Sequence, residues 1–343
     1  MTTDNAQELG LLEQTARDIL GDVAGQDAAK AWQVIASAEL PFLAVPEPAG
    51  GGWLGAAAVV ARISGELATD VPYADAALVG APMLAAAGLE LPTGVAVAAV
   101  VEDATAAPDG DQVRVRATLY RVAWGESAER IVFVAAGDDG DVVVSLDPSL
   151  AEVSSGRNVA GEPRDRVQVD AVVPSSAVAP APAEAREELL RRGALARAVA
   201  MSGAAQAALS ASVRYATERV QFGRPIAKQQ AVQHALAETA AEVEAMRASS
   251  QAAVDVCADE GFLTPRALVA VATAKAQAGA SAEVVARLAH QVHGAIGTTR
   301  EHPLHRVTLR LWSWRDDFGS ERLWQERLGR LALAGDPWEE VTR

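Results

Sequence analysis

The stretch from Glu218 to Glu238, ERVQFGRPIAKQQAVQHALAE, places arginine, aromatic and amide side chains around a sharp break between good helix formers. The break is the tetrapeptide FGRP at 222–225, where glycine and proline both disfavour a continuing helix. The guanidinium of Arg219 suits planar, bidentate contacts with phosphate. A helix end closed by a glycine and anchored by an aromatic ring would give the same pattern, so this stretch alone leaves both interpretations open.

Two pairs of histidines have a spacing that can bind metal. His290 and His293 are three residues apart, as are His302 and His305. No carboxylate completes a close cluster with either pair. We therefore expect packing or hydrogen bonding at helix interfaces for these side chains. The pattern GxGxxG is absent, so the sequence gives no reason to expect a Rossmann NAD site.

Three segments with different residue patterns must position these side chains. Residues 1–95 show helical spacing of apolar residues, 96–182 hold short valine-rich runs between turn sequences, and 183–343 are helical again. We predict an α+β fold, mainly α, with an N-terminal helical domain, a small and mostly antiparallel β domain, and a C-terminal helical bundle. The Pro/Ala/Ser-rich stretch 173–185 reads as a linker, and 46–55 as a loop. Later helices are expected near 184–218, 228–260, 265–298, 302–316 and 319–334.

Composition narrows the classes of function. The net charge of −15 over 343 residues argues against nucleic acid or an anionic membrane surface as a partner, because both are bound through basic patches. No run of 18 apolar residues is uninterrupted, so no membrane span is predicted. Cys257 is the single cysteine and lies in an alanine-rich helical stretch, which fits a buried structural thiol in a reducing compartment. The N-terminal MTTDNAQELG reads as neither signal nor transit peptide, so we expect a cytoplasmic protein.

Four motifs resemble those of the acyl-CoA dehydrogenase family, three of them in the same order in the C-terminal part of the chain. The first is R-x-x-F-G with a later glutamine, formed by Arg219, Phe222, Gly223 and Gln230. QVHGAIG at 291–297 is similar to the family's Q-x-x-G-G-x-G. RDDFGSERLWQERLG stands where the family has Y-E-G-T and a final helix, and LPFLAVPEPAGGG is similar to an N-terminal family motif. The resemblance covers the whole chain and implies the family's three-part fold.

The resemblance implies FAD sites built across the interface of two subunits that pack through their C-terminal bundles. Arg219 would neutralise the FAD pyrophosphate, and Phe222 would pack near the adenine. Gln230 and Gln291 would offer amides to ribityl or ribose oxygens. Ser320 matches the family threonine near the phosphates. The cofactor-binding residues predicted in this way are Arg219, Gln221, Phe222, Gln230, Gln291, Gly294, Ala295 and Ser320.

The catalytic base of the family is missing. Family members remove the α-proton of an acyl-CoA with a glutamate while hydride passes to the flavin. The aligned residue in the Y-E-G-T motif is Phe318, and the second family position, on the first long helix of the bundle, is Gly193. No catalytic residue is therefore predicted. The neighbouring Asp316 and Asp317 are expected on a solvated face or in salt bridges to Arg315 or Arg322.

Two further family features are absent. The family's substrate-holding arginine aligns with Ala194, and we expect the neighbouring Arg191 and Arg192 to be exposed. The family's T-E-x-x-x-G-S-D stretch has no counterpart, and only RVAWGESAERIVFVA at 121–135 is similar to the strand pair that follows it. The half-site for the chain's own flavin therefore looks degraded, whereas the half-site offered to a neighbouring subunit looks intact.

This asymmetry resembles the short subunit of a heteromeric acyl-CoA dehydrogenase, as known from actinobacterial degradation of sterol side chains and rings. A longer subunit would carry the glutamate, with one FAD at each interface of a heterotetramer. The expected partners are that longer acyl-CoA dehydrogenase subunit, an acyl-CoA substrate and an electron-transfer flavoprotein. Two alternatives stay open: a catalytically silent structural or regulatory partner, and a stand-alone homodimeric flavoprotein with a shifted base such as Asp317.

Overall fold

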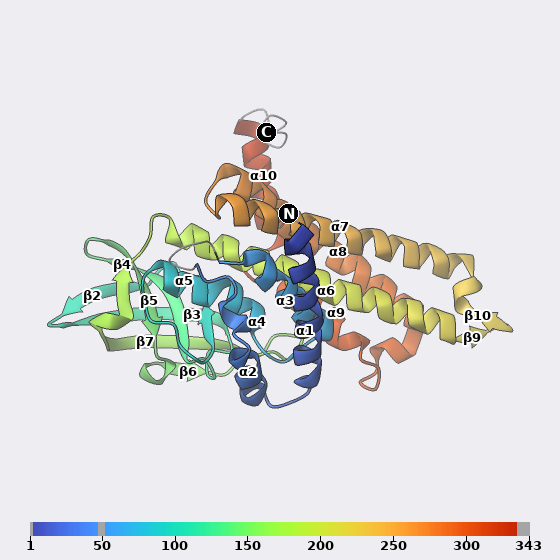
Figure 1. Ribbon diagram of the computed structural model, residues 1–343, viewed down its shortest axis with the longest axis horizontal. Coiled ribbons are helices and arrows are strands. Elements are labelled where there is room, and N and C mark those ends of the chain that lie inside the picture. The colour runs from blue at the N-terminus through green and yellow to red at the C-terminus, as the bar shows by residue number, and fades with distance from the viewer. Residues whose placement is uncertain (1–2, 47–51, 335–343) are drawn as a thin grey trace. The chain divides into compact units, whose positions relative to one another are not determined.

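The computed structural model describes residues 3–46 and 52–334 (Figure 1). These residues group into two compact units, one drawn from 1–60 and 69–196, the other from 61–68 and 197–343. The fold is α+β and mainly helical, as the sequence predicts. The division into three domains at 95 and 182 stays a prediction. Part of the loop expected at 46–55, residues 47–51, lies outside the described residues.

The N-terminal helices of the first unit bury a compact apolar face. Helix α2 begins after Asp27, whose carboxylate accepts hydrogen bonds from the backbone N–H groups of Ala29 and Lys30. It buries Trp32 and Ile35. The helices of this region are α1 (Thr3–Asp22), α2 (Ala28–Ser37), α3 (Leu54–Leu67), which continues into the second unit, α4 (Tyr73–Asp75) and α5 (Ala81–Ala86).

One eight-stranded sheet follows these helices, in the order β6-β7-β3-β2-β4-β5-β8, with β1 paired to β4. Its pairs are antiparallel except β1–β4 and β2–β4, which are parallel. Alternate residues of β3 and β7 face a core that includes Val115, Leu119 and Val167. The strands are β1 (Ala96–Ala98), β2 (Thr105–Asp109), β3 (Gln112–Ala123), β4 (Arg130–Gly137), β5 (Gly140–Leu146), β6 (Glu152–Ser154), β7 (Arg164–Pro174) and β8 (Val178–Pro180).

The predicted linker at 173–185 is wrong in part. Strand β7 continues to Pro174, and β8 then pairs antiparallel with β5, so that Val178 lies opposite Val144 and Pro180 opposite Val142. A strand of three residues ending in proline at a sheet edge has too little alternation to be recognised in the sequence. The chain enters the following helix at Ala185.

The second unit is a bundle of long helices, and their observed bounds lie within a few residues of the predicted ones. Helix α8 packs against α7, α9 and α10. Small residues permit close crossings: a Cβ on Gly203 of α6 would meet the carbonyl oxygen of Arg62 on α3 at 1.9 Å. The helices are α6 (Ala185–Glu218), which begins in the first unit, α7 (Gln230–Glu260), α8 (Pro265–His293), α9 (Leu304–Trp314) and α10 (Glu321–Ala334).

Candidate functional site

The break after α6 is a two-residue β-hairpin rather than a helix C-cap. Strands β9 (Val220–Gln221) and β10 (Arg224–Pro225) pair antiparallel, joined by Phe222 and Gly223. Both joining residues have positive φ, 53° and 75°, as a type I′ turn requires. An aromatic residue adopts this conformation at a cost, and here its ring is 90% exposed at the tip. The hairpin therefore displays Phe222 to the outside.

The base of the hairpin is anchored to two helices. The N–H of Arg219 donates to the carbonyl of Tyr215 on α6, and the carbonyl of Arg219 accepts from the N–H of Ile226, each at 2.9 Å. Ile226 is buried in one apolar cluster with Ala216 of α6 and Val292 of α8. This cluster brings the first and second sequence motifs together, because Val292 follows Gln291.

The polar side chains predicted around this hairpin are free to bind a ligand. Arg219, Gln221, Gln230 and Gln291 are exposed, and their side chains make no hydrogen bond or ion pair with the residues that the structure describes. Helix α8 ends at His293, and Gly294, with φ of 62°, redirects the chain into a 3-10 turn. Gly294 and Ala295 are both exposed there. Seven of the eight predicted cofactor residues thus lie on or beside the hairpin and the end of α8.

Several basic residues lie around the hairpin at 220–225. Only one of them, Arg219, is among the predicted cofactor-binding residues. Arg214, Arg224 and Lys228 join Arg219 around the hairpin, and all four are exposed. None has an ion pair within the ranges 3–46 and 52–334. In a chain of net charge −15, such a group of unneutralised cations favours a phosphate-bearing ligand. The signal in the sequence was the spacing of basic residues from 214 to 228.

The eighth predicted residue, Ser320, lies elsewhere in the unit. It precedes α10, where its hydroxyl accepts from the N–H of Leu323 at 3.4 Å. The adjoining turn is held by Lys275, which donates to the carbonyls of Arg315 (2.6 Å) and Gly319 (2.8 Å). Gln291 follows Lys275 by 16 residues on α8, or about 24 Å at about 1.5 Å per residue. One chain therefore presents two separate groups of flavin-motif residues along α8.

Neither family base position holds a carboxylate, and the charged groups nearby are committed to structure. Asp317 is buried and pairs with Arg197 of α6, Oδ2 to Nε at 3.2 Å. The Arg197 guanidinium also lies over the rings of Trp314 (5.6 Å) and Phe318 (5.8 Å). The carbonyl of Phe318 accepts from the indole N–H of Trp324 at 3.1 Å. The turn at 315–319 is thus held by an ion pair, by contacts of a guanidinium with aromatic rings and by an indole hydrogen bond.

The predicted surroundings of Asp317 are therefore wrong. Asp317 pairs with Arg197, whereas Arg315 pairs with Glu321 at 2.9 Å and Arg322 with Glu326 at 3.0 Å. The local spacing suggested near neighbours, but the actual partner lies 120 positions away in the sequence, on another helix. Asp316 is exposed, as expected.

Lys275 is the most unusual charge of this region. Its side chain is completely buried, and burial lowers its pKa from 10.5 to about 8, an effect that Asp317 partly opposes. It remains bonded to both ends of the turn at 315–319. The sequence gives no sign of this burial, because a lone lysine in an alanine-rich helix is usually at the surface.

Arg191 and Arg192 are not free to hold a substrate. They pair with Glu187 and Glu188 one turn earlier on α6, at 2.6 and 2.7 Å. The predicted exposure of Arg191 is wrong, since only 6% of the residue is accessible. Gly193, at the second family base position, is buried in the same helix.

The histidines pack, as predicted. The ring of His293 stacks on Tyr215 with centroids 4.7 Å apart and lies 4.6 Å from the ring of His302. His290 Nε2 lies 2.9 Å from the hydroxyl of Thr308. Burial is the main cause that lowers the pKa of His290, His293 and His302. Within the described residues, no group of His, Cys, Asp and Glu is arranged to hold a metal ion.

The β-sheet region has a short connection beside a hollow. The connection between β1 and β2 spans only residues 99–104. A hollow of about 790 Å³ adjoins it, and its lining includes Asp103, Arg116 and Tyr120. Loss of flavin binding by the half-site for the chain's own flavin stays a prediction.

The sequence of this chain is similar to sequences of known acyl-CoA dehydrogenases. Residues 184–314 match the family described as acyl-CoA dehydrogenase, C-terminal domain. Acyl-CoA dehydrogenase FadE27 of Mycobacterium tuberculosis is 29% identical over 345 residues, covering 90% of this chain and 91% of the relative. The 3-sulfinopropanoyl-CoA desulfinase of Paraburkholderia xenovorans is 41% identical over 105 residues, covering 31% and 26%.

Solved structures agree over nearly the whole length. A chain of the ChsE4–ChsE5 complex from Mycobacterium tuberculosis has a TM-score of 0.84 at 23% identity, covering 98% of this chain and 99% of that one. A chain of the Tcur3481–Tcur3483 steroid ACAD has a TM-score of 0.80 at 27% identity, covering 96% and 99%. The fold is thus that of an acyl-CoA dehydrogenase. Residues 184–314 are similar to the C-terminal domain of the acyl-CoA dehydrogenase family, whose members are FAD flavoproteins, and the predicted resemblance agrees with this match.

The sequence predicts no membrane-spanning helix, a prediction that can be compared with the described helices. Among the described helices, none combines the length and the apolar character needed to cross a bilayer.

Proposed function

We propose that this chain is the base-lacking subunit of a heteromeric acyl-CoA dehydrogenase, which catalyses FAD-dependent α,β-dehydrogenation of an acyl-CoA thioester. The observation that carries the proposal is the hairpin at 220–225. It holds Phe222 outward, 90% exposed, beside the unpaired side chains of Arg219, Gln230 and Gln291. An exposed aromatic ring in a strained backbone conformation is expected where a ligand or partner covers it.

The residues present fit FAD. The guanidinium of Arg219 is free to pair with a pyrophosphate, and the amides of Gln230 and Gln291 are free to bind hydroxyl groups. Phe222 is available to cover an adenine ring. When bound, FAD supplies the acceptor for the hydride. This chain's contribution is to bind and orient the cofactor, since Phe318 and Gly193 hold no proton acceptor at the family base positions.

A partner subunit must then supply the base. We propose a longer acyl-CoA dehydrogenase subunit that carries the glutamate and binds most of the FAD, in a heterotetramer that passes electrons to an electron-transfer flavoprotein. The likeness to the Tcur3481–Tcur3483 steroid ACAD supports an acyl group derived from a steroid side chain or ring.

The stand-alone alternative has less support. Asp317, the candidate shifted base, is 8% accessible and paired with Arg197 inside the bundle. A general base must reach the substrate proton within hydrogen-bond distance, which a buried ion pair opposes. The silent structural partner remains the competing class, because it requires no contact between the hairpin and FAD.

Arg219→Ala separates these functions. In the complex co-purified with the longer subunit, we expect FAD affinity to fall by about tenfold or more, as for loss of a charge-assisted hydrogen bond. Arg247→Ala, at an exposed arginine of α7, is the matched control and should leave FAD content unchanged. Equal FAD content in the Arg219→Ala complex and the wild type would contradict the proposed cofactor role and favour the structural partner.

A further inference from the structure

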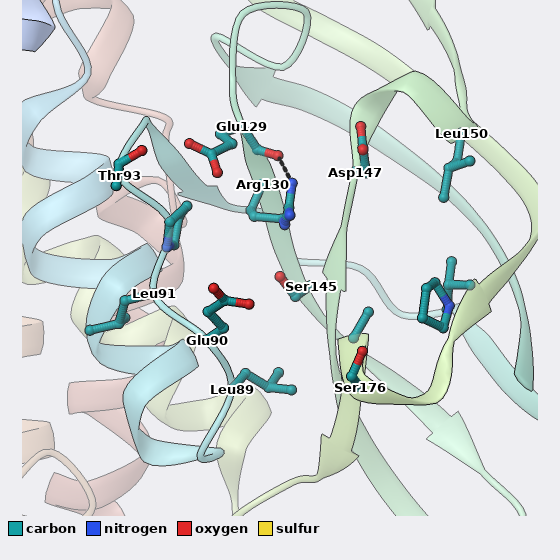
Figure 2. Close-up of a pocket in the computed structure, with 14 residues that line it drawn as sticks. Leu89, Glu90, Leu91, Thr93, Glu129, Arg130, Ser145, Asp147, Leu150 and Ser176 are labelled. Carbon is teal, nitrogen blue, oxygen red and sulfur yellow. Dashed lines mark hydrogen bonds between the residues drawn. The ribbon is translucent and has the colours of Figure 1, made fainter.

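A second site lies in the first unit, built from residues that the flavin motifs do not include. It is a cavity of about 430 Å³ between the segment 89–93, which leads into β1, and the strands β4 and β5 (Figure 2). This volume is in the range of small-molecule sites. Its lining residues are Leu89, Glu90, Leu91, Pro92, Thr93, Glu129, Arg130, Ser145, Asp147, Leu150, Val173, Pro174, Ser176 and Ala177.

A buried hydroxyl without a partner points into this cavity. Ser145 on β5 is only 7% accessible, and its side chain makes no hydrogen bond with the part of the chain that the structure describes. Figure 2 shows the Ser145 hydroxyl and the Glu90 carboxylate both directed into the space. The residue is largely buried but its hydroxyl faces the cavity without a partner among the described residues, so this hydroxyl is available to bind a ligand.

The rim of the cavity is fixed in advance. The carboxylate of Glu129 accepts from the N–H of Gly94 at 2.6 Å, and Arg130 donates through one N–H to the carbonyl of Glu129 at 2.8 Å. A Cβ at position 94 would lie 2.5 Å from the Glu129 carboxylate, so a larger residue there would displace this side chain. Asp147 is held by the N–H of Ser149 at 2.9 Å. Such preorganisation lowers the cost of binding.

The charge of the lining selects a cation. Three carboxylates, Glu90, Glu129 and Asp147, surround one guanidinium, Arg130, so the formal charges sum to −2. Hydrogen bonds from Ser149 are the main cause that lowers the pKa of Asp147, which keeps it ionised. Glu90 has no ion pair among the described residues. An anionic ligand would be repelled, and a ligand with two positive groups would neutralise the site.

We propose that this cavity binds a small aliphatic diamine. One ammonium group pairs with Glu90, the second lies near Asp147, and the apolar chain packs on Leu89 and Leu150. The Ser145 hydroxyl accepts a hydrogen bond from the ammonium group beside Glu90. The site is independent of the proposed dehydrogenation.

Isothermal titration calorimetry on the full-length protein at fixed ionic strength tests the proposed diamine binding. The three ligands each have eight carbons: diaminooctane, octanediol and octanedioate. We expect diaminooctane to bind once per chain, octanediol more weakly and octanedioate not at all. Glu90→Gln should lower the affinity for diaminooctane by about fivefold, which is the effect expected for loss of a partly exposed ion pair. Ser145→Val replaces the acceptor hydroxyl by methyl groups and narrows the cavity, so it should clearly weaken binding, with little effect on folding because the hydroxyl has no partner to lose.

Glu102→Gln is the matched control, since it removes the same charge from an exposed residue outside the cavity. It should leave the affinity for diaminooctane unchanged. Equal loss in Glu102→Gln and Glu90→Gln would mean general attraction to an acidic protein and would overturn the proposal. Absence of diaminooctane binding, equal binding of all three compounds, or full binding by Ser145→Val would also overturn it.

Discussion

Arg197 and Asp317 form an ion pair inside the helical bundle, with Nε and Oδ2 3.2 Å apart and both side chains buried. The pair stands next to Phe318, where the family carries its catalytic glutamate. A buried pair is costly to break, because the remaining charge loses its partner in a medium of low dielectric constant. In this region the acidic side chain of Asp317 is thus part of a structural contact.

Breaking this pair should destabilise the protein strongly. We expect Asp317→Asn to lower the free energy of unfolding by about 3 kcal/mol or more, because it removes the carboxylate charge that pairs with the buried Arg197 guanidinium. Glu244→Gln, which breaks an exposed pair with Arg247 on α7, is the control and should have little effect. Urea denaturation followed by circular dichroism measures both. Equal stability of Asp317→Asn and the wild type would show that the pair contributes nothing.

Lys275 should make stability depend on pH above neutrality. Its pKa falls from 10.5 to about 8 in the folded state, so between these values the unfolded chain binds a proton that the folded chain has released. The unfolded state then binds more protons, and stability rises with pH across this window, by about 3 kcal/mol in all.

Lys275→Met tests this linkage. The variant should lose the rise in stability between pH 8 and 9.5, and it should be less stable at pH 7 because the carbonyls of Arg315 and Gly319 lose their donor. Lys228→Met, at an exposed lysine, serves as the control. The same slope of unfolding free energy against pH in wild type and Lys275→Met would exclude Lys275 as its source.

The histidines near the hairpin should make the protein sensitive to acid. Burial lowers the pKa of His290, His293 and His302 below 6.5, so the folded state keeps them neutral while the unfolded chain takes up protons. Stability should then fall as pH decreases from about 6.5 toward 5. His293→Phe keeps a ring against Tyr215 and should reduce this loss. Thermal melting between pH 5 and 7.5 measures it, and an unchanged pH slope would contradict the assignment.

The tip of the hairpin should matter for FAD rather than for folding. Phe222 makes few contacts that stabilise the chain, since its ring is 90% exposed, so Phe222→Ala should leave thermal stability nearly unchanged. FAD retained by the co-purified complex should nevertheless decrease. Leu333→Ala, at a residue 92% exposed on α10, controls for loss of an exposed apolar group. Full FAD retention by Phe222→Ala would show that the ring does not cover the cofactor.

The sequence predicts the helices of the bundle and the valine-rich strands well, because their periodicity is local and long. The hairpin at 220–225 escapes prediction, since its type I′ turn places Phe222 at positive φ, which no propensity favours for an aromatic residue. The Arg197–Asp317 pair escapes for another reason: its partners are far apart in the sequence and meet only through helix packing. Strand β8 is too short to show alternation.

The candidate site also has features that the sequence predicts and features that only the structure shows. Motifs identify Arg219, Phe222, Gln230 and Gln291 as residue types, but their shared exposure and lack of partners appear only in three dimensions. The distance of Ser320 from this group depends on the length of α8 between Lys275 and Gln291, which no motif encodes.

The visible absorption spectrum of the purified chain, alone and after co-expression with a longer acyl-CoA dehydrogenase homologue, tests the central claim most directly. We predict no stoichiometric flavin band for the chain alone, and one FAD per heterodimer in the co-purified complex. A stoichiometric flavin band from the chain alone would contradict this account, because it would mean that the protein completes a FAD site with itself.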